Sequence, residues 1–330
     1  MDLPLFSALF VVCSLLLYTV LDGFDLGVGA LLLLPHDEHV RDRMVDSIVP
    51  IWDGNETWLI MAGVTLFAAF PLAYGILLPA FYLPLIIMLL GLGLRGVSFE
   101  FRMQVSRARW AWDIAFSLGS IVAALMQGLI VGGLIQGVAV DGERFSGSVF
   151  DVFRPFCLLV AISLLAGYVV LGAGWLHLKA TGPVRMFAER SLRIAAVAFV
   201  SLAILSTATA AVAYETVMTA WATHPVVLTA ISVTFLALAL MVLRAVGAGA
   251  DGRPFYLGLT LFALGVIGLG VVILPYMVPY RLTLWEAASA RSSQLFVLIG
   301  ALVVTPIVLG YSAFAYYVFR GKTPEHGWET

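Results

Sequence analysis

The chain has 330 residues, of which 62% are hydrophobic and only 12% are charged, and its mean hydropathy is +1.02. Soluble domains have about 45–50% apolar and about 25% charged residues, so this composition excludes an ordinary soluble protein and indicates a polytopic membrane protein. The formal net charge of −2 gives no basis for nucleic-acid binding. The two cysteines, Cys13 and Cys157, lie in apolar runs, which is typical of buried thiols.

Nine stretches are apolar enough to cross a bilayer as helices, which requires about 20 residues each. We predict an all-α polytopic membrane protein, with residues 1–330 forming a single integral-membrane domain of about nine transmembrane helices in bundles. The predicted spans are 5–34, 54–71, 74–94, 114–138, 155–177, 192–213, 225–247, 255–278 and 293–318. The first is over-long, so its end should leave the membrane or kink near its glycines. Pro71 should break the chain between the second and third spans.

The basic residues predict the orientation of these spans. With a periplasmic N-terminus and a cytoplasmic C-terminus, 14 of the 18 basic residues fall on the cytoplasmic side, as the positive-inside rule requires. The cytoplasmic set is Arg41, Arg43, Arg95, Arg102, Arg107, Arg109, Lys179, Arg185, Arg190, Arg193, Arg244, Arg253, Arg320 and Lys322. The external set is Arg144, Arg154, Arg281 and Arg291. No basic residue precedes Arg41, so a signal peptide is not expected and the first helix should remain.

The first predicted span contains two carboxyl groups, Asp22 and Asp25, within the sequence LDGFDLGVGA. Their i,i+3 spacing places them on one helix face. An ionised carboxylate at membrane depth costs at least about 2.5–3.5 kcal/mol, so each should face a partner, water or a cavity, or carry a proton. Gly23 and Gly27 form a small-xxx-small pair, which favours close approach of another helix. The alternative is that both acids are hydrated at the helix end.

A second acidic pair, Asp53 and Glu56, begins the second predicted span in the sequence IWDGNETWL. Their spacing is that of a capping box, with Asp53 as the N-cap and Glu56 three residues later. Capping does not explain why Trp52, Asn55 and Trp58 crowd the same turn. An acidic, amphipathic site at the mouth of the membrane could also admit protons, and the two roles are compatible.

A third group of charges follows in LRGVSFEFR and continues to Asp113. Arg95 ends the third predicted span, Glu100 and Arg102 lie beyond it, and Asp113 opens the fourth, where an acid suits a helix N-terminus. Arg102 satisfies the topology rule without any further role. Arg95, among apolar neighbours, could instead hold a carboxylate or a cofactor propionate in a bidentate contact.

Haem and nucleotide sites are not expected in this chain. A haem in the bilayer needs axial ligands such as His or Met, and no histidine lies deep in a predicted span. The five histidines are His36, His39, His177, His224 and His326. Met126 is more typical of core packing, and the phosphate-binding pattern GxxxxGK[ST] is absent. We therefore expect no metal ligands, no nucleophilic triad and no catalytic residue in this chain alone.

Several uncommon motifs, occurring in order, resemble subunit II of the cytochrome bd-type quinol oxidases. They are DGFDLGVG (22–29), WDGNETWL (52–59), FP with the following Tyr74, RGVSFEFR (95–102) and LTLWEAASARSSQL (282–295). The last is more similar to the cyanide-insensitive branch of the family. The resemblance extends over the whole chain, with about the expected number of helices.

The resemblance implies a terminal oxidase of the aerobic respiratory chain in the bacterial cytoplasmic (inner) membrane. Such a complex oxidises ubiquinol or menaquinol and reduces oxygen to water with protons taken from the cytoplasm. Its subunit I carries the quinol site, haem b and haem d (or b in its place), whereas subunit II carries no haem. Partners in the family are subunit I, membrane lipid and, in some members, a small accessory single-span subunit. Some members hold a structural quinone in subunit II, but no residue here identifies that site.

The same resemblance implies a proton route at the boundary between the two subunits. By motif, Asp53 beside Trp52 is the carboxylate that takes up protons, and Asp22 and Asp25 follow it. Glu56 is included in this route but departs from the family pattern, since some members have Gln at its position. An extra acid there could alter proton entry or merely add charge.

The resemblance also implies structural or haem-supporting charges at Asp25, Arg95, Glu100 and Asp113. Two alternatives remain: a scaffold subunit that conducts no protons, and a secondary transporter that uses the intramembrane acids for coupling.

Overall fold

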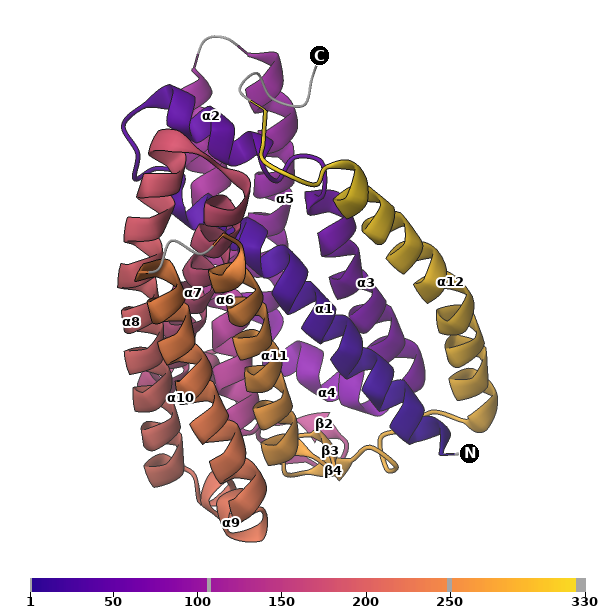
Figure 1. The fold of residues 1–330 in the computed structure, drawn as a ribbon. Helices are drawn as coiled ribbons and strands as arrows, with labels where there is room; N and C mark the ends of the chain where they lie inside the picture. Colours follow the sequence, from indigo (N-terminus) through magenta and orange to yellow (C-terminus); the bar gives the residue numbers. More distant parts are fainter. Residues whose placement is uncertain (1, 106–107, 248–250, 325–330) are drawn as a thin grey trace.

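The computed structural model describes residues 2–105, 108–247 and 251–324, and this part is almost entirely helical (Figure 1). Arg107 and His326, which the sequence assigned to cytoplasmic segments, lie outside it. The α-helices are α1 (Leu3–Leu31), α2 (Glu38–Asp46), α3 (Trp52–Ala69), α4 (Pro71–Ala80), α5 (Tyr82–Gln104), α6 (Arg109–Gln136), α7 (Pro155–Lys179), α8 (Gly182–Ala213), α9 (Glu215–Thr223), α10 (Pro225–Gly247), α11 (Arg253–Ile273) and α12 (Arg291–Val318). Two antiparallel hairpins, β1 (Val140–Asp141) with β2 (Arg144–Phe145) and β3 (Tyr276–Val278) with β4 (Leu282–Thr283), and the 3-10 helix η1 (Asp151–Phe153) lie in the connections.

The predicted fold class, an all-α polytopic membrane protein, is confirmed. In the described part, eight helices are long and apolar enough to cross a membrane: α1, α5, α6, α7, α8, α10, α11 and α12. Helix α3, which corresponds to the second predicted span, has 18 residues and lies against α1 and α12. Its polar first turn, with Asp53, Asn55 and Glu56, keeps α3 out of that set. A ninth crossing by α3 stays a prediction.

The third predicted span, 74–94, is wrong as one continuous helix. Helix α3 ends at Ala69 and Pro71 begins the short helix α4, as predicted for that break. A second break follows at Phe81, after which α5 begins. The reason is Pro84, whose ring would clash with the carbonyl group four residues earlier in an unbroken helix. Helices α2 and α9 and the hairpin β1–β2 lie in segments that were predicted as connections. The predicted span 255–278 is too long at its end, because α11 ends at Ile273 and β3 occupies Tyr276–Val278.

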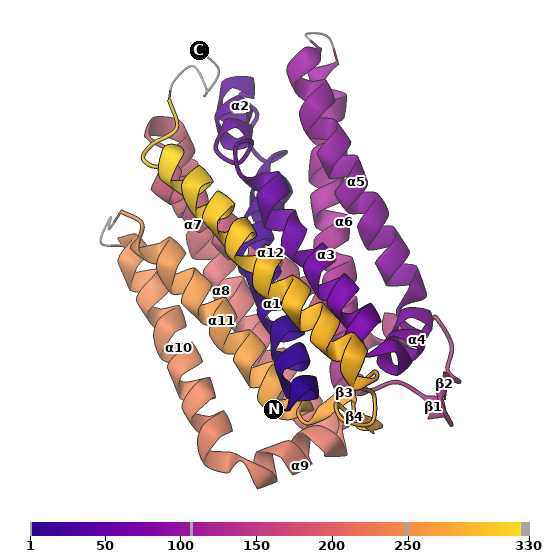
Figure 2. The ribbon, with the colours of Figure 1, turned by 90° about the vertical axis from the view of Figure 1, so that its right-hand side faces the viewer.

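Helix α1 lies in the middle of the bundle, against α3, α6, α7, α11 and α12 (Figures 1 and 2). Its contact with α7 depends on two glycines. A Cβ atom built on Gly27 would overlap the carbonyl oxygen of Tyr168, and one built on Gly172 would overlap the backbone of Gly27. The close approach predicted from the glycine pair is therefore confirmed at Gly27, and it keeps the acidic half of α1 away from lipid.

The two ends of the chain lie at opposite ends of the bundle. Figure 1 shows α1 beginning at its lower end, whereas α12 ends at the upper end, near α2. Helix α12 crosses in front of α1 and α3 in Figure 2 and has few buried residues: Gln294, Ala301, Ser312 and Ala315. The assignment of the upper end to the cytoplasm stays a prediction from the basic residues.

Candidate functional site

The two acids of α1 are completely buried and belong to an ion-pair cluster. Asp22 and Arg95 are both 0% exposed, and Arg95 Nη2 lies 2.7 Å from Asp22 Oδ1. The same nitrogen lies 2.8 Å from Glu56 Oε2, and the Glu56 side chain is 26% exposed. The alternative of acids hydrated at a helix end is therefore wrong. Two kinds of partner were predicted for Arg95, a carboxylate or a cofactor propionate. In the structure Arg95 of α5 binds carboxylates from α1 and α3.

The second acid, Asp25, has a neutral partner instead of a cation. Asn55 Nδ2 donates to Asp25 Oδ2 at 2.7 Å, and the hydroxyl of Tyr316 donates to Asn55 Oδ1 at 2.8 Å. Asn55 is 1% exposed and Asp25 is 0% exposed. Within the described ranges, Asp25 Oδ1 has no hydrogen-bond partner. One carboxyl oxygen is thus fixed by an amide while the other remains free to hold a proton or a water.

A small cavity of about 30 Å³ lies beside Asn55. Its lining includes Asp53, which is exposed, and the buried Asn55 and Ser312, with Tyr316 at the side. A water needs about 10–15 Å³ of such space and two to four polar partners. The cavity can therefore hold one or two waters between the exposed carboxylate and the Asn55–Asp25 pair.

The predicted capping box at the start of α3 is wrong. The residue before the helix is Ile51, and no side chain caps the helix there. Backbone donors are satisfied by the preceding turn, since the N–H groups of Ile51 and Trp52 both donate to the carbonyl oxygen of Ile48. Asp53 and Glu56 are therefore not needed as caps. Asp53 faces the small cavity and Glu56 binds Arg95.

Aromatic rings cover the cluster on one side. The guanidinium carbon of Arg95 lies 5.9 Å from the Trp52 ring centroid, and Trp52 stacks on Phe99 at 4.9 Å. A cation over an aromatic face is stabilised by the ring quadrupole. Trp52, the predicted neighbour of Asp53, thus contributes to the environment of Arg95.

A chain of neutral polar groups, which the sequence analysis missed, extends from the cluster into the bundle. Gln127 Nε2 donates to the hydroxyl of Tyr18 at 2.6 Å, and the hydroxyl of Tyr168 donates to Gln127 Oε1 at 2.6 Å. Tyr18 lies one helical turn before Asp22 on α1. Gln127 could have been noticed in the sequence as a polar residue within an apolar span, because a buried polar group requires a hydrogen-bond partner.

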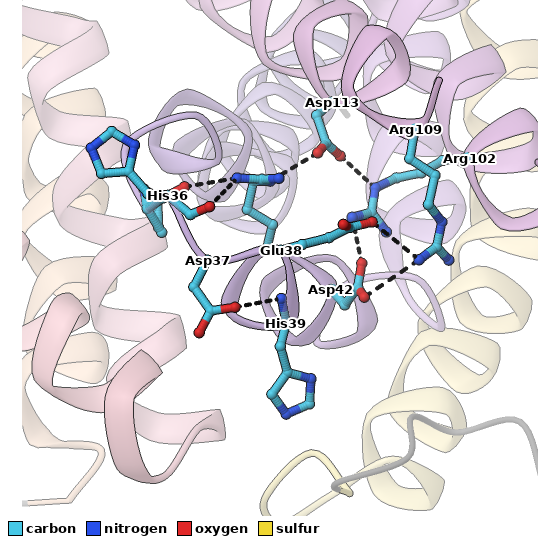
Figure 3. Close-up of polar contacts among 10 residues, drawn as sticks. His36, Asp37, Glu38, His39, Asp42, Arg102, Arg109 and Asp113 are labelled. Carbon is cyan, nitrogen blue, oxygen red and sulfur yellow. Dashed lines mark hydrogen bonds and ion pairs between the residues drawn. The ribbon is translucent and has the colours of Figure 1, made fainter. Parts of the chain in front are cut away.

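A second ionic network lies at the α2 end of the molecule and is separate from the first (Figure 3). Asp113 Oδ2 accepts from Arg41 Nε at 2.9 Å, and Asp113 Oδ1 accepts from Arg102 Nε at 2.5 Å. Arg102 also binds Asp42 at 2.6 Å, and Arg109 lies 3.5 Å from the same carboxylate. These contacts fasten α2 to α5 and α6, so this network is a structural brace.

Two expectations about this second network are wrong. Asp113 does not open a helix: α6 begins four residues earlier, at Arg109, and Asp113 is a buried partner of two arginines. Arg102 does more than satisfy the topology rule, because it is 3% exposed and paired on both sides. Glu100 is exposed and belongs to neither cluster.

A third group of charges joins the ends of α7, α8 and α12 with the α10–α11 connection. His177 Nε2 lies 3.3 Å from Glu189 Oε1, while Arg185 Nη1 and Lys322 Nζ lie 2.5 Å and 3.3 Å from Asp251 Oδ1. Although slight burial acts in the opposite direction, hydrogen bonds and charge from Lys322 and Arg185 hold the pKa of Asp251 below its ordinary value. These contacts fix the predicted cytoplasmic ends of four helices.

Buried histidines are scarce among the described residues. His36, His39 and His224 are exposed, and His177 is buried but faces Glu189 at the end of α7. In residues 2–105, 108–247 and 251–324, no three metal-ligating side chains converge. The carboxylates of the main cluster are engaged by Arg95 and Asn55. Carboxyl groups of this kind can hold and pass on protons.

Fold and site together define a multi-pass helical membrane subunit with a buried carboxylate cluster. The sequence model of the family described as cytochrome bd terminal oxidase subunit II matches residues 3–319. The chain belongs to this family. It is thus a multi-pass protein of the bacterial inner membrane and one subunit of a haem-containing oxidoreductase complex with a partner subunit I.

Individual relatives agree with this assignment. The chain is 28% identical to cytochrome bd-I ubiquinol oxidase subunit 2 of Escherichia coli strain K12, over 92% of this chain and 91% of that protein. It is 30% identical to cytochrome bd ubiquinol oxidase subunit 2 of Bacillus subtilis strain 168, again over 92% and 91%. Its fold matches a chain of the bd oxidase from Geobacillus thermodenitrificans with a TM-score of 0.80 at 16% identity, covering 97% and 99% of the two chains.

Proposed function

We propose that this subunit carries protons from the cytoplasm toward the haem-bearing subunit I of a bd-type quinol:oxygen oxidoreductase. One observation carries the proposal: the exposed Asp53 and the buried Asn55 border the same water-sized cavity, and Asn55 donates to the buried Asp25. Proton transfer requires titratable groups or waters at hydrogen-bond spacing. In this proposal, haem b, haem d (or b) and the quinol site belong to subunit I, and this chain supplies no catalytic residue.

The proposed route begins at Asp53, which exchanges protons with the cytoplasm. Water in the cavity passes the proton inward, and Asp25 receives it on the oxygen that the Asn55 amide leaves free. Asp22 lies one helical turn away on the same face of α1 and continues the route, held by Arg95. Glu56, which is partly exposed and bound to Arg95, offers a second acidic group at the same mouth.

The charges of the cluster support a resident proton. Three carboxyl groups, Asp22, Asp25 and Glu56, surround a single guanidinium, and both contacts of that guanidinium go to Asp22 and Glu56. An uncompensated carboxylate is costly to bury. We infer that Asp25, whose hydrogen-bond partner is neutral, carries the transferable proton.

We expect Asp53→Asn to slow oxygen reduction by about 10- to 100-fold, because the amide cannot take up protons. The exposed side chain contributes little to packing, so the purified complex should keep its yield and its haem spectrum. Glu38→Gln is the matched control: it removes another exposed acid at the same end, and turnover should stay normal. Normal turnover of an assembled Asp53→Asn complex would show that protons enter elsewhere.

We expect Asp25→Ala to lower the haem content of the partner subunit, with the d-type haem (or the b-type haem in its place) affected most. The change removes the shorter of the two contacts of the Asn55 amide nitrogen, leaving that with the Leu21 carbonyl oxygen, and opens a cavity beside α1. Asp25→Asn keeps the volume and should retain more haem while still blocking proton transfer. The measurement is the visible absorption spectrum of each purified complex, and full haem content in Asp25→Ala would contradict a haem-supporting role.

The scaffold alternative has its own support, since Arg95 ties α1, α3 and α5 together and would do so without conducting protons. A scaffold predicts normal turnover after the carboxyl groups are neutralised in an assembled complex. The transporter alternative predicts a protein that purifies alone and colourless, whereas an oxidase subunit purifies with a haem-bearing chain.

A further inference from the structure

Helix α12 contributes two polar side chains to the proposed proton entrance. Ser312 and Tyr316 lie one helical turn apart, and both line the cavity beside Asp53 and Asn55. Ser312 is 9% exposed, and within the described residues its Oγ has no hydrogen-bond partner. A buried hydroxyl without a partner normally binds water, so this group indicates an ordered water in the cavity.

The space for this water is kept open by a glycine on the opposite wall. A Cβ atom on Gly54 would lie 3.6 Å from the Tyr311 ring and 3.9 Å from Ser312 Oγ, so any larger side chain would enter the cavity. A water there would have Ser312 and Asp53 among the polar residues that line its cavity. These two groups meet the minimum number of polar partners that an ordered water requires.

The second residue, Tyr316, helps to fix the direction of the Asn55 amide, together with the Leu21 carbonyl oxygen, which accepts from Asn55 Nδ2 at 3.3 Å. An amide has a donor end and an acceptor end of nearly equal shape, so its orientation is decided by its partners. Because the Tyr316 hydroxyl donates to Oδ1, the NH₂ end must face Asp25, to which it donates. Without the hydroxyl, the orientation would depend on the Nδ2 contacts with Asp25 and with the Leu21 carbonyl oxygen. An amide that turned over would present its oxygen to Asp25, which would then have to keep its proton.

We infer that α12 completes the proton entrance: Ser312 holds a water between Asp53 and Asn55, and Tyr316 is a positioning residue that orients the Asn55 amide toward Asp25. This inference rests on the proposed function, and it assigns to the least buried of the long helices a role in the same reaction.

The position of Tyr316 is itself secured by the segment that follows α12. Lys179 Nζ donates to the carbonyl oxygen of Phe319 at 2.5 Å, and Lys322 Nζ donates to that of Leu178 at 2.8 Å. The Thr323 N–H donates to the carbonyl oxygen of Lys179 at 2.8 Å. The end of α12 is therefore fastened to the end of α7 less than one helical turn after Tyr316, although few residues of α12 are buried.

The test uses the whole oxidase complex carrying Tyr316→Phe or Ser312→Ala, each of which removes one oxygen atom. Turnover at saturating quinol is measured across pH, together with the haem spectrum. We expect each variant to be about 5- to 10-fold slower near neutral pH, and its rate to fall further in proportion to the proton concentration as pH rises. A merely structural role would lower the rate equally at all pH values. Tyr317→Phe, at a neighbouring residue that is 64% exposed, is the control and should behave as the unmodified complex.

The outcomes separate this inference from the proposed function. Unmodified rates and pH profiles for both variants, with a slow Asp53→Asn complex, would overturn the role of α12 and leave the proton route in place. An unaffected Asp53→Asn complex would overturn the route itself. Should Tyr316→Phe assemble poorly, Ser312→Ala decides the water site, and a normal pH profile in that variant would contradict it.

Discussion

Replacing Arg95 by leucine is expected to abolish accumulation of a stable protein. The change leaves the fully buried Asp22 and the partly buried Glu56 without their common cation. Removing one partner of a buried ion pair costs about 3–5 kcal/mol, because the remaining charge is uncompensated. That is a large fraction of the about 5–15 kcal/mol by which folded proteins are stable. The measurement is the yield and thermal stability of the purified complex.

The control for this prediction removes the charges on both sides. Arg95→Gln combined with Asp22→Asn and Glu56→Gln leaves only neutral groups of similar shape, so the complex should accumulate at a much higher level than with Arg95→Leu alone. The prediction fails if Arg95→Leu yields a complex as stable as the unmodified one. Equal loss in the neutral combination would show that packing, and not charge, makes Arg95 necessary.

Replacing Gly27 by valine is expected to separate α1 from α7 and so to prevent correct packing of the bundle. Any Cβ atom at this position overlaps the carbonyl oxygen of Tyr168, which is backbone and cannot move aside by rotation. Overpacking a core typically costs about 1–3 kcal/mol and costs more where no side chain can yield. We expect a strong loss of yield and of thermal stability, and Gly27→Ala should already show a large part of it.

Gly63 of α3 provides the matched control, because a Cβ atom there meets nothing within 4 Å. Gly63→Ala should leave the protein unchanged or slightly more stable, since alanine has the higher helix propensity. Equal tolerance of alanine at Gly27 and Gly63 would mean that α1 and α7 do not approach as closely as their glycines indicate.

The long helices could be predicted from the sequence, because lipid requires continuous apolar runs with satisfied backbone groups. The segment 74–94 shows where this reasoning fails: its composition suits one span, but Pro84 imposes a break at Phe81. Helix α2 was missed for a related reason. It is short and polar, and its stability comes from charged contacts such as Arg102–Asp42, whose partners are distant in the sequence.

The acids of the site could also be predicted, since a carboxylate in a span needs an explanation wherever it occurs. Their partners could not. The sequence left two possible partners for Arg95, a carboxylate or a cofactor propionate. In the structure its partners are two carboxylates. Asn55 was noted only as part of a crowded turn. Tyr316 and Ser312 carried no signal at all, because tyrosine and serine are ordinary in membrane helices and these two lie about 260 residues from Asn55 in the chain.

The first and last helices are in direct contact: Ser7 of α1 donates to Gln294 of α12, and Trp285, before α12, donates to Asp2. During synthesis at about 5–20 residues per second, α1 leaves the ribosome many seconds before Arg95 and α12 exist. Its two acids must therefore enter the insertion machinery without their final neighbours. A nascent chain that stalls before the last helix would leave Asn55 without the Tyr316 hydroxyl, beside a fully buried carboxyl group.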